Sequence, residues 1–84
     1  MRDKDEKINF TMLTSGDEGV ILSFEKGESE AYRKKLLAMG LTPGTAFRVV
    51  RTAPLGDPVE ITLRGYSVSL RRAEAAAISV MKTN

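Results

Sequence analysis

The side chains that most often hold metals are few in this chain. It has no His and no Cys, which leaves carboxylates, carbonyls and thioethers as ligands for a divalent cation. Acidic residues gather in two places, at Asp17 and Glu18 and again at Glu25, Glu28 and Glu30. Neither group has the regular ligand spacing of a calcium-binding loop. We therefore interpret these carboxylates as ordinary solvated side chains and expect no metal site and no bound cofactor.

Catalytic motifs are also missing from the sequence. Without His or Cys the commonest general base and the thiol nucleophile are absent, and no phosphate-binding loop of the Gly-x-x-x-x-Gly-Lys-Ser/Thr type occurs. Several arginines leave open that the chain supplies an arginine finger to another protein: Arg33, Arg48, Arg51, Arg71 and Arg72. Solvated strand and helix faces explain these arginines more simply. The sequence therefore predicts a protein that is not an enzyme.

A short proline-containing segment is the best candidate for binding a partner. Pro54 and Pro58 restrict the backbone at its ends, and Gly56 permits a sharp bend beside Asp57. Leu55 then lies at the tip of a stiff loop, where docking orders little additional chain. The alternative is a plain hairpin connection in which Leu55 folds back onto the domain. We take Pro54, Leu55, Gly56 and Asp57 as candidate contact residues.

One amphipathic helix is predicted over residues 29–39. Tyr32, Leu36 and Met39 recur at spacings of four and three, which places them on one face. Gly40 is expected to end the helix because glycine adopts the left-handed conformation freely. The helix positions its polar side chains away from this apolar face.

The other side of the helix is basic. Arg33 and Lys34 lie there and form a second candidate contact surface. The chain as a whole has 13 basic and 11 acidic residues, a net charge of +2. Domains that bind nucleic acid usually carry a larger basic excess on one face. We therefore expect a protein partner and no nucleic acid.

Five segments have the composition or the alternation of β-strands: residues 20–24, 45–53, 59–64, 66–71 and 77–81. A Pro-Gly turn at residues 42–45 precedes the second segment, and Gly65 joins the third to the fourth. Short strands with one apolar face each need a second layer or closure of the sheet. We predict a mainly β fold, a small β-barrel of about five strands with one helix between the first and second strands.

The length of 84 residues is that of a single domain. Residues 1–8 are rich in charge and predict a flexible N-terminal tail, and residues 9–84 predict the folded domain. No apolar run approaches the roughly 20 residues that cross a bilayer, and the N-terminus lacks the apolar segment of a signal peptide. We expect a cytoplasmic protein that does not insert into a membrane.

Two motifs in this order resemble a known family. The first is EAYRKKLLAMGLTPG at residues 30–44, and the second is APLGDPVEI at residues 53–61, with FRVVR at 47–51 between them. With VSLR at 68–71, they resemble the ferrous iron transport protein A family, FeoA, over about residues 12–82. The resemblance implies an SH3-like barrel of the bacterial cytoplasm that works beside a membrane GTPase-coupled ferrous iron transporter.

This resemblance implies an accessory or regulatory protein of ferrous iron uptake that binds the cytoplasmic part of a FeoB-like transporter GTPase. A third small accessory protein and a second copy of the chain stay open as further partners. Two alternative functions also remain. One is a transition-metal-sensing or metallochaperone domain, and the other is a free-standing relative of the SH3-like domain of iron-dependent repressors.

Overall fold

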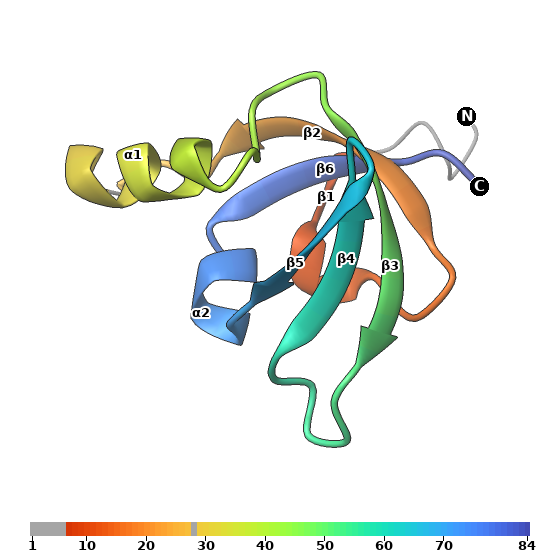
Figure 1. Cartoon of the computed structure of the whole chain (residues 1–84). Helices are drawn as coiled ribbons and strands as arrows, with labels where there is room; N and C mark the ends of the chain where they lie inside the picture. Colours follow the sequence, from red (N-terminus) through yellow and green to blue (C-terminus); the bar gives the residue numbers. More distant parts are fainter. Residues whose placement is uncertain (1–6, 28) are drawn as a thin grey trace.

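A strongly curved antiparallel sheet forms the body of the protein. The computed structural model describes residues 7–27 and 29–84. Within these residues, six strands pair in the order β1-β6-β2-β3-β4-β5. Their bounds are β1 Lys7–Asn9, β2 Glu18–Phe24, β3 Ala46–Thr52, β4 Val59–Leu63, β5 Tyr66–Leu70 and β6 Ile78–Lys82. Figure 1 shows the sheet curling so that β1 and β6 lie behind β3, β4 and β5.

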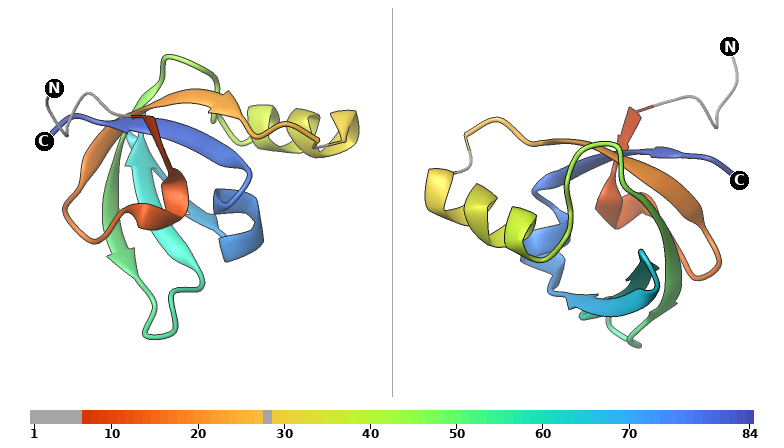
Figure 2. Two further views of the ribbon diagram at one scale, coloured as in Figure 1. Left: turned by 180° about the vertical axis from the view of Figure 1, so that it is seen from behind. Right: turned by 45° about the horizontal axis from the view of Figure 1, so that its top comes forward.

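Three helical segments accompany the sheet in the described part of the chain. They are the 3-10 helix η2 Phe10–Met12, the helix α1 Glu30–Ala38 and the short helix α2 Arg72–Ala75. Helix α1 extends outward from the body, and α2 lies at the end of β5 (Figures 1 and 2). None of the described helices is long and apolar enough to span a bilayer.

The ends of α1 lie where local sequence signals place them. The side chain of Ser29 caps the first turn, with Tyr32 N–H donating to its Oγ at 3.1 Å. At the other end Gly40 has φ 95°, and Leu41 N–H donates to the Leu36 carbonyl at 3.2 Å. This is the Schellman closure that a glycine after the last helical turn predicts. The predicted helix and its glycine stop are confirmed.

The core fills the space that the sheet encloses. Phe47 and Val49 of β3 are buried, whereas Val50 is 41% exposed, so this strand has one face in the core and one in solvent. Phe10 of η2 stacks on Phe47 with ring centroids 4.9 Å apart and adds an aromatic pair to the core. Within α1 as described, Leu36 is the buried side chain. Most of the core therefore comes from the strands.

Tight turns direct the strands into the barrel. Gly44 has φ 91°, and Thr45 N–H donates to the Thr42 carbonyl at 3.1 Å, as a type II turn requires. Arg64 and Gly65 both have positive φ, 51° and 83°, and form a two-residue connection between β4 and β5. The predicted mainly β, SH3-like barrel is confirmed.

The N-terminal boundary and the number of strands differ from the prediction. We assigned residues 1–8 to a flexible tail, but Lys7 and Ile8 belong to β1 and pair with β6. The sheet therefore has six strands in the described residues rather than about five, and α1 follows the second strand rather than the first. A strand of three residues carries little local pattern, and its pairing partner lies at the far end of the chain. Residues 1–6 lie outside the described residues.

Candidate partner-binding surfaces

The loop between β3 and β4 presents an apolar side chain to solvent. Leu55 is 92% exposed and lies in the hairpin connection that projects from the barrel at the bottom of Figure 1. The alternative in which Leu55 folds back onto the domain is therefore wrong. An exposed leucine on a projecting loop is available to enter an apolar pocket of a partner.

Backbone hydrogen bonds hold this loop in one shape. Ala53 N–H donates to the Pro58 carbonyl at 3.1 Å, and Gly56 N–H donates to the Ala53 carbonyl at 2.7 Å. The Asp57 carboxylate accepts Arg72 N–H at 3.0 Å, which ties the loop to the start of α2. Because the backbone is already ordered, docking of Leu55 loses little conformational entropy.

The second predicted surface lies elsewhere on the molecule. Arg33 and Lys34 are exposed on α1, and Leu37 on the same helix is 40% exposed. Both views in Figure 2 place α1 well away from the β3–β4 loop. The structure therefore does not bring the two predicted groups, residues 54–57 and residues 33–34, into one site. Their contact roles stay predictions.

An ion pair fixes α1 against α2. Lys35 Nζ lies 2.7 Å from Glu74 Oε2, and Arg71 N–H donates to Glu74 Oε1 at 2.8 Å. Burial of the Glu74 carboxyl disfavours its charge, but the hydrogen bonds from Lys35 and Arg71 outweigh burial and lower its pKa below 4.5. The hydrogen bond to Glu74 likewise raises the pKa of Lys35. Both groups are therefore charged at neutral pH.

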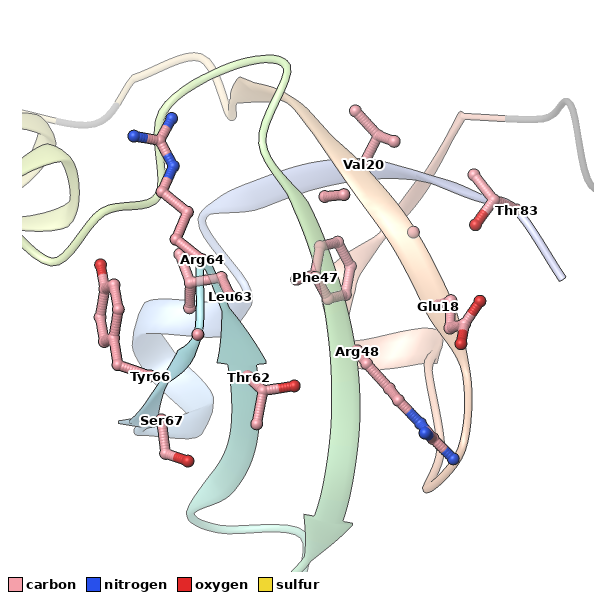
Figure 3. Close-up of a pocket in the computed structure, with 13 residues that line it drawn as sticks. Glu18, Val20, Phe47, Arg48, Thr62, Leu63, Arg64, Tyr66, Ser67 and Thr83 are labelled. Atoms are coloured by element: carbon pink, nitrogen blue, oxygen red, sulfur yellow. The ribbon is translucent and has the colours of Figure 1, made fainter.

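A groove on the outside of the sheet was not predicted. This cavity of about 490 Å³ crosses β2, β3, β4 and β5, and Arg48, Arg64, Thr62 and Ser67 are among its lining residues. Figure 3 shows Arg64 at one end and Arg48 beside Glu18 at the other. Residues from several strands line this groove, so no motif in the sequence indicates it. The alternation within each strand indicates only which side chains point outward. Charged and hydroxyl-bearing side chains lie among apolar ones such as Val20 and Leu63 in this lining.

Protein donors bind two of the carboxylates considered as metal ligands. Asp17 accepts Thr14 N–H at 2.9 Å, and Glu25 accepts Ser79 O–H at 2.7 Å. The bond from Ser79 is the main cause of a lowered pKa at Glu25. Glu28 lies outside the described residues. Across residues 7–27 and 29–84 no group of three or more acidic, His or Cys side chains is placed to share a metal ion.

Comparisons with known proteins identify relatives of this chain. The model of the FeoA domain family matches residues 8–82. A Porphyromonas gingivalis protein, the Fe(2+) transport protein A/Fe(2+) transporter FeoB fusion protein, is 46% identical over 73 residues. That match covers 87% of this chain but only 8% of the fusion protein. The chain therefore corresponds to a small part of this much longer relative.

Solved structures agree with the fold. The crystal structure of the iron uptake regulatory protein FeoA superposes with a TM-score of 0.82 at 26% identity, covering 92% of this chain and 99% of that protein. A manganese-dependent transcriptional repressor superposes with a TM-score of 0.81, covering 93% of this chain and 42% of the repressor. At 15% identity, the repressor shows the likeness of fold alone.

Proposed function

The chain belongs to the FeoA family, and on that premise we propose that it is a non-enzymatic adaptor of ferrous iron uptake. It binds the cytoplasmic part of a FeoB-like transporter GTPase and regulates GTP-driven transport. The fusion relative supports this proposal because it joins the two proteins in a single polypeptide. On this proposal, non-covalent association takes the place of the covalent link in that relative.

The exposed side chain of Leu55 carries the proposed contact. A leucine that moves from water into an apolar pocket contributes about 1.5–3 kcal/mol. The hydrogen bonds across Ala53, Gly56 and Pro58 keep the loop ordered before binding, so little of this free energy is lost to ordering. The basic side of α1, with Arg33 and Lys34, forms a secondary contact.

The adaptor acts without chemistry of its own. The chain has no His and no Cys, and its surfaces offer a projecting loop and an open groove. Nucleotide hydrolysis then belongs to the transporter, and this chain acts by binding in the cytoplasm. It needs no metal and no cofactor for that role.

The proposed contact is tested by Leu55→Asp, with Met12→Asp as the matched control. Met12 is also exposed, at 69%, but lies on η2. Binding is measured by interferometry on the full-length transporter in nanodiscs, and folding by circular dichroism. We expect Leu55→Asp to weaken binding about tenfold or more and Met12→Asp to bind like the wild type.

Two results would contradict the proposal at different levels. Equal binding by Leu55→Asp and the wild type would refute the assignment of the loop. Absence of any binding by the wild type, both with GDP and with a GTP analogue on the transporter, would refute the adaptor function itself.

A further inference from the structure

Strand β5 forms one open edge of the sheet. It pairs with β4 alone. In a two-residue hairpin the pair that flanks the turn is hydrogen-bonded, and hydrogen-bonded pairs alternate along the ladder. The pair Leu63–Tyr66 flanks the turn here and is hydrogen-bonded. Val68 lies two residues after Tyr66, so its backbone groups also point at β4. The N–H and C=O groups of Ser67 and Ser69 therefore point away from the sheet.

These backbone groups lie uncovered. Ser67 and Ser69 are exposed, and neither takes part in the backbone hydrogen bonds that the described residues make outside helices and strands. The hydroxyl of Tyr66 donates to the Met39 carbonyl at 3.2 Å, so the end of α1 contacts the beginning of β5, and Met39 also lines a cavity with Ser69 near the end of the strand. Proteins usually protect such an edge with proline, charge or a covering segment. The strand sequence YSVSL has neither proline nor charge.

Positive charge stands at both ends of this edge. Arg64 precedes β5, and Arg71 and Arg72 follow it. Of the acidic groups nearby, Glu74 is paired with Lys35 at 2.7 Å, and Asp57, which accepts Arg72 N–H, leaves one negative charge beside the three arginines. A strand that carries acidic side chains therefore complements the edge, because opposite charges on neighbouring strands stabilise pairing.

A cavity beside the end of β5 gives room for a side chain of the added strand. Its volume is about 460 Å³, and Met39, Pro58 and Ser69 line it together with the charged groups Asp57, Arg71 and Glu74. Backbone hydrogen bonds along a sheet edge supply affinity in strand addition, and pockets for alternate side chains supply specificity. Both elements are present at β5.

We propose that the free edge of β5 binds an extended acidic segment of the transporter's cytoplasmic part as an additional strand. This inference rests on the proposed function and adds a second surface to the Leu55 loop. A second copy of the chain fits the edge less well. An antiparallel pair of β5 strands centred on Val68 brings the Arg64 end of one copy to the Arg72 end of the other, and like charges at close range repel.

Amide hydrogen exchange measures strand addition directly. In the free protein we expect the amides of Ser67 and Ser69 to exchange fast and that of Val68 to be protected, since Val68, unlike the two serines, faces β4. Full-length transporter in nanodiscs should slow exchange at Ser67 and Ser69. Continued fast exchange of both amides in the bound state would overturn the proposal without any mutation.

The matched variants are Ser69→Pro and Ser69→Ala. Proline at a free edge removes an N–H that the fold does not use and blocks an incoming strand, while alanine keeps the backbone donor. We expect Ser69→Pro to weaken transporter binding by about tenfold or more and Ser69→Ala to bind like the wild type. Circular dichroism checks that both variants fold.

Charge neutralisation tests the acidic character of the segment. Arg71→Gln should weaken binding and flatten its dependence on salt, because exposed charge pairs are screened by ions. Lys26→Gln makes the same change in charge in the β2–α1 connection. It should leave both the binding and its dependence on salt unchanged.

The outcomes separate this inference from the proposed function. If Ser69→Pro binds the transporter as tightly as the wild type does, the β5 edge is not the binding surface, and the adaptor function still stands. Absence of wild-type binding refutes both. A dimer in sedimentation velocity that is lost in Ser69→Pro would assign the edge to a second copy and overturn the acidic segment.

Discussion

Replacing Gly40 by alanine tests how closely the end of α1 approaches β5. Gly40 has φ 95°, a conformation that side-chain-bearing residues rarely adopt. A Cβ atom at this position would overlap the hydroxyl oxygen of Tyr66 and would lie 3.2 Å from Leu63 Cδ1. The Tyr66 hydroxyl donates to the Met39 carbonyl at 3.2 Å, so moving the ring breaks that bond.

The destabilisation has two additive parts. The left-handed conformation costs a residue with a Cβ about 1–2 kcal/mol, and loss of the Tyr66 hydrogen bond costs about 1 kcal/mol. Tyr66 is 45% exposed, so its ring can swing out of the way and no larger penalty arises. We expect Gly40→Ala to lower the free energy of unfolding by about 2–3 kcal/mol, which corresponds to about 10–20 °C in Tm for a domain of this size.

Urea unfolding followed by circular dichroism measures this change, and Gly44→Ala provides the matched control. Gly44 has φ 91° with no atom within 4 Å of an added Cβ, so it carries the backbone penalty alone. In the double variant Gly40→Ala/Tyr66→Phe the hydroxyl is already gone, and the combined destabilisation should be about 1 kcal/mol smaller than the sum of the single changes. Equal destabilisation by Gly40→Ala and Gly44→Ala would refute the close approach to Tyr66.

Two further predictions concern the ion pair and a buried glycine. Glu74→Gln should lower the free energy of unfolding by about 1 kcal/mol at pH 7. Because the pKa of Glu74 is lowered in the folded protein, this contribution is present above the ordinary glutamate pKa and is lost as the pH falls through the folded-state pKa. The difference in urea midpoint between variant and wild type should therefore shrink as the pH is lowered below 4.5. Gly19→Ala should destabilise by about 1–3 kcal/mol in the same assay, because the new Cβ would lie 2.8 Å from the Met81 carbonyl oxygen and 2.9 Å from Phe47 Cζ; a midpoint equal to that of the wild type would contradict this packing.

Features set by neighbouring residues were predictable from the sequence. Ser29 and Gly40 lie at the two ends of the helix they bound, and capping acts within a turn of the chain. The alternation in β4 and β5 likewise follows from residues next to one another. These local signals predicted the main helix, most strands and a tight connection at Gly65, to which the structure adds Arg64.

Features set by distant pairing were not predictable in the same way. Strand β1 forms because Lys7 and Ile8 pair with Met81 and Val80 of β6. The local pattern of three residues does not indicate that pairing. The groove at Arg48 and the open edge of β5 depend on which strands become neighbours. The sequence also left undecided whether Leu55 folds back, because its exposure depends on the direction in which the β3–β4 loop leaves the barrel.

The pairing of β1 with β6 also determines how the domain can be tethered. Lys7 lies opposite Met81, and the side chain of Asn84 accepts Glu18 N–H at 2.8 Å, so both ends of the described chain leave the barrel from the same region. Figures 1 and 2 show the C-terminal end away from the tip of the β3–β4 loop. A linker attached at the C-terminal end would not obstruct the β3–β4 loop. The same domain can therefore serve as a separate polypeptide or as a segment of a longer chain.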